Sequence, residues 1–202
     1  MTELSTYPRA TRAAGQETRR ALLDAAARLF EGNGLADVSA ADIARAAGVF
    51  PSQVTYYFGS KEGLFVEAAC RGVLHAATDV ERAGRRTRSP RSYVRAVVHT
   101  ALASPALLSF VEAALLVRCR PELAPRVRET FERLHGEAER AVEESLIKRG
   151  WQIRADAATE ARGFWAAMFG VVLESAASGD TFNEATAEAT VQLVLNLYEE
   201  RP

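Results

Sequence analysis

The side chains best suited to a chemical role cluster in one short segment, residues 51–58, which reads PSQVTYYF. Hydroxyl, carboxamide and phenol groups can hydrogen-bond to the edges of DNA bases in the major groove, and a carboxamide can pair with adenine. The polar side chains of the segment that can do this are Ser52, Gln53, Thr55 and Tyr56. Val54 and Phe58 are four residues apart, so on a helix they share one face and point into a core. The segment therefore predicts a helix with one apolar face and one face that can read DNA.

A second short helix and a turn come directly before this segment. Asp42 follows Ser39 by three residues, which is the spacing of a capping box at the start of a helix. Gly48 is suited to end that helix, and Pro51 suits the first turn of the next one, because its missing N–H costs nothing there. Two helices joined by a short glycine turn form a helix-turn-helix, which places its second helix in the major groove.

Several short motifs extend this pattern, in order and at fixed spacing, over residues 16–69. They are the apolar helix 20–30, then Gly34, Asp42-Ile43-Ala44, Ala47-Gly48-Val49, Tyr56-Tyr57-Phe58 and Ser60-Lys61-Glu62. In these residues the chain resembles the tetracycline-repressor (TetR/AcrR) family of bacterial transcription regulators. The resemblance implies base contacts from the polar residues of segment 51–58. It implies phosphate contacts from Ser39 or Ala40, from Tyr57 and from Lys61. Phe50 and Gly59 depart from the family, which usually has a small or polar residue at the first position and often a charge at the second.

The hydrophobic pattern divides the chain into three parts. Residues 1–15 are polar and contain Pro8 and Gly15, so we expect a disordered arm that either frays or follows DNA through its arginines. Residues 16–60 are expected to form a three-helix DNA-binding head. Residues 61–202 are expected to form a helical ligand-binding and dimerisation domain, which begins with a connecting helix over 61–83. Helical periodicity recurs throughout and no segment keeps a period of two, so we predict an all-α protein with about nine helices.

The second domain contains a segment, residues 105–117, that is apolar on nearly all sides of a helix and is therefore expected to be buried. Aromatic and polar residues around it suggest a pocket for a small apolar or amphipathic molecule. The candidate lining residues are Tyr93, His99, Phe110, Glu112, Arg118, Trp165 and Phe169. The alternative is ordinary structure, with the aromatics in the core, His99 in the core or at the surface, and Glu112 and Arg118 as surface charges or a mutual pair.

The last two helices, expected over residues 156–178 and from residue 184 on, are long, amphipathic and joined by a short turn. Such a hairpin can pack against its own copy as a four-helix bundle. The candidate residues for this dimer interface are Val172, Leu173, Val191, Leu195 and Tyr198. The alternative is that they belong to the core of one chain. A dimer would place two recognition helices on a near-palindromic DNA site, about 34–36 Å apart or a multiple of that distance.

Charge and composition exclude several other functions. The net charge is −1, and residues 1–61 hold seven Lys and Arg against six Asp and Glu, so nucleic-acid binding must rest on local geometry. We find no nucleophile–base pair, metal-ligand spacing or phosphate loop, so we expect no enzyme, cofactor or metal. No apolar run spans a membrane, and we expect a cytoplasmic, nucleoid-associated bacterial protein. The predicted function is a dimeric DNA-binding regulator that a small apolar or amphipathic ligand releases from its operator, and the family resemblance implies that it is a repressor. The alternative is a regulator without such a ligand, controlled by a protein partner or by its abundance.

Overall fold

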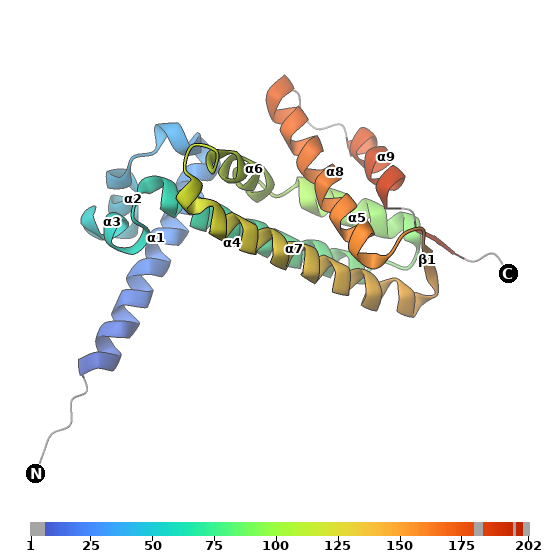
Figure 1. The fold of residues 1–202 in the computed structure, drawn as a ribbon, viewed down its shortest axis with the longest axis horizontal. Helices are drawn as coiled ribbons and strands as arrows, with labels where there is room; N and C mark the ends of the chain where they lie inside the picture. Colours follow the sequence, from blue (N-terminus) through green and yellow to red (C-terminus); the bar gives the residue numbers. More distant parts are fainter. Residues whose placement is uncertain (1–6, 180–183, 196, 200–202) are drawn as a thin grey trace, which may run out of the picture. The chain divides into compact units, whose positions relative to one another are not determined.

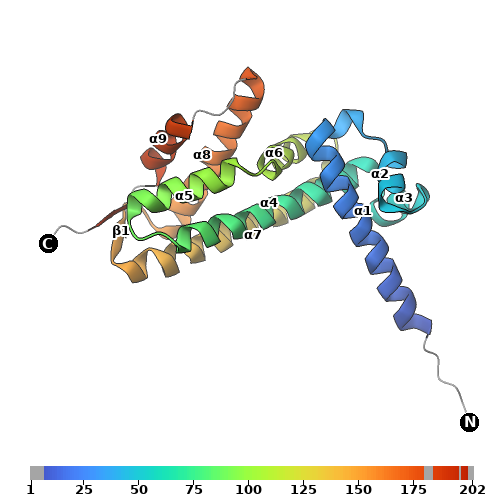
Figure 2. The same ribbon diagram turned by 180° about the vertical axis from the view of Figure 1, so that it is seen from behind.

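The computed structural model describes residues 7–179, 184–195 and 197–199, which form nine α-helices, two 3-10 helices and two short strands (Figures 1 and 2). The all-α prediction is therefore confirmed, with a minor sheet added. By its internal contacts the chain divides into two compact units, Met1–Ala69 and Cys70–Pro202. The division lies inside helix α4 (Lys61–Arg85), not at residue 60 as we expected. The reason is that Leu64, Phe65 and Val66, in the first turns of α4, are buried in the first unit.

The first unit contains three helices before α4. They are α1 (Tyr7–Asp37), α2 (Ala40–Ala47) and α3 (Ser52–Phe58). Their core is built from apolar side chains at helical spacing, and the Phe30 and Phe65 rings meet edge-on with centroids 5.0 Å apart. The buried core residues are Leu22, Ala25, Ala26, Phe30, Ile43, Ala44, Val54, Leu64 and Phe65. This small core holds α3 in place and leaves its other face exposed.

Helix α1 begins earlier than we expected. Residues 7–15 are helical where we predicted a disordered arm, while residues 1–6 lie outside the described part of the chain. Alanine-rich sequence favours a helix here, and the helix continues through Gly15. The missing side chain of Gly15 leaves room for the Tyr57 side chain. A Cβ at this position would lie 3.2 Å from the Tyr57 hydroxyl oxygen. The sequence Gly32-Asn33-Gly34 favours a left-handed stop after the first helix, and at Gly34 the backbone (φ 69°, ψ 176°) does leave the helical conformation.

The second unit packs its helices around α8, which contacts α5, α6, α7 and α9. The helices are α5 (Pro90–Leu102), α6 (Ala106–Leu116), α7 (Ala124–Ser145), α8 (Ala157–Ser178) and α9 (Glu184–Val194), with 3-10 helices η1 (Pro121–Leu123) and η2 (Ile147–Arg149). Helix α6 buries Leu107 and Phe110, but Leu115 is exposed, so α6 is covered on one side only. The prediction that this segment is buried all round was wrong, because α7 and α8 cover a single face of it.

Two short strands near the end of the second unit were missed from the sequence. Strand β1 (Trp151–Ile153) pairs antiparallel with β2 (Leu197–Glu199), with Gln152 opposite Tyr198. The expected last helix therefore stops at Val194 instead of reaching Tyr198, and three residues are too short to show alternation. Thr181-Phe182-Asn183-Glu184 also has the spacing of a capping box for this last helix, but residues 181–183 lie outside the described ranges. No single helix in the described residues is long and apolar enough to cross a membrane. Helices α5 and α6 together have the length and apolar composition of a span, but they are bent by 65° relative to each other.

Candidate nucleic-acid interface and second-unit cavities

The start of α2 is fixed by the predicted capping box. The Ser39 hydroxyl accepts a hydrogen bond from the Asp42 backbone N–H at 3.1 Å, and the Asp42 carboxylate accepts one from the Ser39 N–H at 3.3 Å. The Ser39 hydroxyl also bonds the carboxylate, and with the Arg45 guanidinium it lowers the pKa of Asp42. Gly48, with φ 69° and ψ 30°, then ends α2 in the left-handed conformation, as expected.

Helix α3 presents the two faces predicted for it. Val54 is 1% exposed and belongs to the core, whereas Tyr56 on the opposite face is 77% exposed. Ser52 and Thr55 are exposed and Gln53 is half-buried, so the four predicted base-reading side chains lie on the accessible part of the helix. Phe58, which we placed in the core, is only half-buried.

The residues expected to contact phosphate have structural partners as well. The Lys61 ammonium donates a hydrogen bond to the Leu35 carbonyl at 2.8 Å, which ties the start of α4 to the end of α1. Tyr57 is half-buried, and its ring lies edge-on to Tyr56 with centroids 4.8 Å apart. Ala40 is half-buried at the first position of α2. Of the residues predicted to contact phosphate, only Ser39 is exposed, and its hydroxyl accepts the capping hydrogen bond from the Asp42 N–H.

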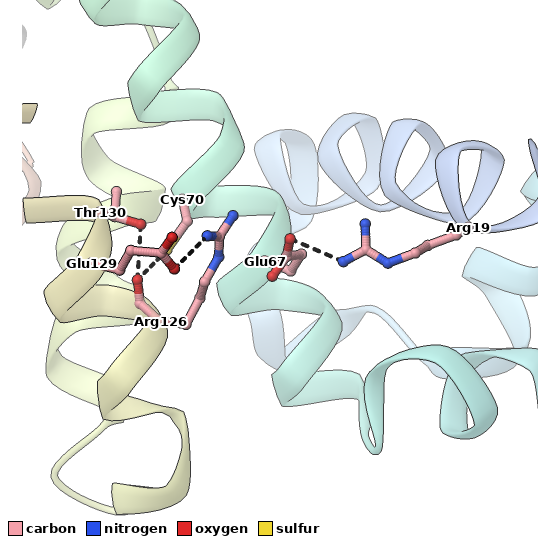
Figure 3. Close-up of polar contacts among 6 residues, drawn as sticks. All are labelled: Arg19, Glu67, Cys70, Arg126, Glu129 and Thr130. Atoms are coloured by element: carbon pink, nitrogen blue, oxygen red, sulfur yellow. Dashed lines mark hydrogen bonds and ion pairs between the residues drawn. The ribbon is translucent and has the colours of Figure 1, made fainter. Parts of the chain in front are cut away.

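An arginine bridge across the first unit was not predicted. The Arg19 guanidinium of α1 forms an ion pair with the Glu67 carboxylate of α4 at 3.0 Å, and Figure 3 shows the two side chains pointing toward each other. The same guanidinium lies over the Phe58 ring, with its carbon 5.0 Å from the ring centroid. One side chain thus connects α1, α3 and α4. No sequence pattern predicts this pair, because Arg19 and Glu67 are 48 residues apart.

A cavity lies inside the second unit, between α4, α5, α7 and α8. The volume open to the centre of a water molecule is about 50 Å³. Its walls carry three aromatic rings, many small apolar side chains and two carboxylates; the lining residues are Ala77, Val80, Glu81, Tyr93, Val97, Leu134, Glu137, Ala138, Ala141, Val142, Ala161, Phe164, Trp165 and Leu195. The Trp165 indole N–H is buried without a hydrogen-bond partner. Burial raises the pKa of Tyr93 to about 12, so its phenol is neutral in the folded protein.

The structure brings only part of the predicted pocket together. Tyr93 and Trp165 line the cavity, whereas His99, Glu112 and Arg118 are exposed on the surface of the second unit. Phe110 and Phe169 join an aromatic cluster in which the Phe169 ring stacks on Trp165 at a centroid distance of 5.7 Å. Glu81 and Glu137 were missed, since nothing in their spacing marks them as neighbours.

A second, open hollow lies next to this aromatic cluster. It has a volume of about 520 Å³ and is lined in part by Val117, Val127, Phe131, His135, Gly136 and Arg162. Burial and the Arg162 charge lower the pKa of His135. Both hollows therefore have aromatic side chains, but the first is the more enclosed and the more apolar one.

The predicted dimer-interface residues separate into two groups. Val172, Val191 and Leu195 are buried within one chain, and Leu195 also lines the cavity. Leu173 and Tyr198 are about half exposed. Three of the five predicted residues therefore serve the core of one chain, and only Leu173 and Tyr198 remain accessible.

Comparison with known proteins finds one matching family model in each of the two units. The family described as bacterial regulatory proteins, tetR family, matches residues 22–68, and the family described as bacterial transcriptional repressor, C-terminal, matches residues 90–194. The chain belongs to the tetR family. It is thus a DNA-binding transcriptional regulator of a family whose members are not enzymes, and its helix-turn-helix is α2–α3.

Individual relatives of this tetR-family regulator match it to different extents. The regulator BetI of Burkholderia mallei is 31% identical over 85% of this chain and 89% of its own length. BetI 1 of Chromohalobacter salexigens is 38% identical, but the match spans only 40% of each protein. A crystal structure assigned as a transcriptional regulator from Rhodococcus sp. RHA1 is 37% identical, covers 90% of this chain and 97% of its own, and superposes with a TM-score of 0.82.

Proposed function

We propose that this regulator binds a near-palindromic DNA site as a homodimer, represses transcription from it, and is released when a small molecule binds the second unit. The observation that supports this most directly is that α3 has one buried face and one exposed polar face. Val54 anchors the helix in the core, while Ser52, Thr55 and Tyr56 stand exposed on one side of a seven-residue helix. A recognition helix needs this combination, because its reading side chains must be held rigidly and yet remain free to enter a groove.

Dimerisation follows from how little DNA one α3 can read. A helix of seven residues reaches only a few base pairs, so a useful site requires two heads in a symmetric assembly. Of the five predicted interface residues, Leu173 on α8 and Tyr198 on β2 are the two whose side chains stay exposed in one chain. We therefore expect dimer contacts to involve these two residues.

The composition of the enclosed cavity indicates the kind of effector. Most of its wall is apolar, Glu81 and Glu137 are its charged lining residues, and among the residues that the structure describes no Lys, Arg or His lines it. These carboxylates are paired with Arg85 and Arg133. Aromatic faces and carboxylates favour a neutral or cationic organic molecule over an anion. The unpartnered Trp165 indole N–H would donate to an acceptor on that molecule and so recover a hydrogen bond.

The small size of the cavity supports a switch between two states. A volume of about 50 Å³ holds only a few water molecules. An effector must therefore select or create a wider state of the second unit. Helix α4 carries both the cavity residues Val80 and Glu81 and the head residue Lys61, so one continuous helix connects the two functions. A coupling of ~1–3 kcal/mol would lower DNA affinity ~5–150-fold.

The first experiment tests DNA binding and dimerisation. The full chain is used to select duplexes from a randomised library, and fluorescence anisotropy measures binding to the enriched sequence at two salt concentrations. We expect an inverted repeat, bound by a dimer that light scattering detects, with affinity falling as salt rises. If no sequence is enriched, or if a monomer binds a single half-site with full affinity, the proposal of dimeric operator binding is wrong.

The second experiment tests the effector site with two matched variants on α7. Ala138→Leu fills the enclosed cavity, and Gly136→Leu, two residues away, fills the open hollow instead. Neutral aromatic compounds and organic cations are screened by thermal shift and then added to the protein–DNA complex. We expect active compounds to lose their effect in Ala138→Leu and keep it in Gly136→Leu. The reverse result would move the effector to the open hollow. If no compound acts on the wild-type protein, the ligand-free alternative, with control by a partner or by abundance, is correct.

A further inference from the structure

Phe50, in the turn between α2 and α3, is the most exposed large hydrophobic residue of the described chain. It is 78% exposed, close to Tyr56 at 77%, whereas the remaining exposed large hydrophobic residues lie between 47% and 55%. Single exposed hydrophobic side chains are common on protein surfaces, so exposure alone decides nothing. The position of Phe50 in the backbone gives the second observation.

Phe50 lies directly before the N-cap residue of α3, Pro51, which has a helical backbone (φ −55°, ψ −32°) and no side-chain group that could cap the helix. The Phe50 carbonyl accepts a hydrogen bond from the Gln53 N–H at 3.0 Å, which begins the first turn of α3. Ser, Thr, Asp or Asn at an N-cap position would bond a free backbone N–H through the side chain. This chain uses that device at Ser39, Ser89 and Asp156 for α2, α5 and α8. Helix α3 has no side-chain cap hydrogen bond at its start.

The Phe50 side chain gains little within its own chain. None of the ring contacts among the described residues involves Phe50, although Tyr56, Tyr57 and Phe58 contact one another in sequence. Phe50 thus supplies no helix cap and exposes an aromatic ring to water, without a ring contact among the described residues in return. A local rule that is broken without compensation inside the fold points to a functional position.

We infer that Phe50 reads sequence by packing its ring against the C5-methyl group of a thymine in each half-site. This inference rests on the proposed binding of DNA by α3. Phe50 comes two residues before Ser52, and the N-terminal residues of a recognition helix are those that meet base edges. Thymine is the one base that offers a methyl group in the major groove, and an aromatic ring is a suitable partner for it. The exposed polar side chains of Ser52, Thr55 and Tyr56 follow it on α3, and such a surface suits a base edge better than an apolar protein surface.

The inference predicts discrimination between thymine and uracil, which differ only by this methyl group. In the duplex selected by the wild-type chain, each thymine pair of the inverted repeat is replaced in turn by deoxyuridine. Burying one methyl group corresponds to about fourfold in affinity, and two symmetric half-sites to about 15-fold. We expect this loss at one symmetric thymine position for the wild-type protein. For Phe50→Ala, the thymine and uracil duplexes should bind equally at that position.

Two further variants separate this role from others. Phe50→Ser replaces the exposed ring with a polar side chain, so it should fold as well as wild type and still lose the discrimination. Leu115→Ala removes an exposed hydrophobic side chain from the second unit and should leave the discrimination unchanged. The inference is overturned if no uracil substitution weakens wild-type binding, or if the Phe50 variants weaken binding to thymine and uracil duplexes alike. Failure to enrich any duplex would instead refute the DNA-binding proposal beneath it.

Discussion

The two faces of α3 predict that stability and DNA binding can be separated by two substitutions two residues apart. Val54→Ala changes the buried face, and Tyr56→Ala changes the exposed face. Val54→Ala deletes two methyl groups at a site that is 1% exposed. The transfer term is about 1.5 kcal/mol, and an unfilled cavity brings the expected loss to about 2–3 kcal/mol.

Tyr56→Ala should behave in the opposite way. An exposed side chain contributes within about 0.5 kcal/mol to stability, and its edge-on contact with Tyr57 is also open to water. A lost base contact costs ~1–3 kcal/mol in each half-site, or ~2–6 kcal/mol for a dimer on an inverted repeat. Specific affinity should therefore fall at least about 30-fold, while binding to unrelated DNA at low salt is retained.

The assay must report on the head itself. Trp151 and Trp165 both belong to the second unit, so tryptophan fluorescence would miss unfolding of α1–α3. Hydrogen exchange of the α2 and α3 amides measures the local stability, and anisotropy with the selected duplex measures affinity. Tyr56→Phe is the control that keeps the ring and removes only the hydroxyl. If Tyr56→Ala speeds exchange throughout α3 as much as Val54→Ala does, the assignment of faces is wrong.

Three further predictions concern the electrostatics of the fold. A double-mutant cycle of Arg19→Ala and Glu67→Ala should give a coupling of about 0.5–1 kcal/mol in head stability by hydrogen exchange, and zero coupling would contradict the bridge. The pKa of Asp42 is lowered in the folded state, so its stabilisation is present above the ordinary value of 3.8 and is lost as the pH falls through the lowered value. Wild type and Asp42→Ala should therefore converge in stability at acid pH, and a constant difference would count against the cap. The raised pKa of Tyr93, about 12, means that stability is lost as the pH rises from 10 toward 12, and Tyr93→Phe should remove that loss together with the latest step of the tyrosinate absorbance titration.

The head was predictable because its signals are local. A capping box, a left-handed glycine and an apolar residue four positions from another all act within a few residues of chain, so the sequence specifies them directly. The capping of α2 by Ser39, its end at Gly48 and the burial of Val54 were each found where the pattern indicated. What the pattern missed in the head was long-range, namely the Arg19–Glu67 pair and the Lys61 hydrogen bond to Leu35.

The second unit was predictable as helices but not as a site. Helix ends there depend on tertiary contacts: β1 and β2 form because two distant segments supply each other's backbone hydrogen bonds. Trp151 of β1 is buried, and its ring centroid lies 6.0 Å from that of Tyr93. The Arg149 guanidinium lies over the Trp151 ring, with its carbon 5.0 Å from the ring centroid. Such a cluster joins residues more than 50 positions apart, which periodicity in one helix cannot show.

Of the predicted pocket residues, only Tyr93 and Trp165 line the enclosed cavity, for a reason that also bears on specificity. The prediction relied on large aromatic side chains, but most of these pack against one another and fill the space between them, as Phe110 and Phe169 do against Phe131. A cavity exists where facing side chains are small, and four alanines line this one: Ala77, Ala138, Ala141 and Ala161. Because the rest of the second unit is closely packed, the side-chain size at each of these four positions strongly affects the volume of the cavity. Enlarging any one of them should therefore narrow the range of effectors more than changing an aromatic residue, and relatives with different side chains at these four positions should accept different ligands.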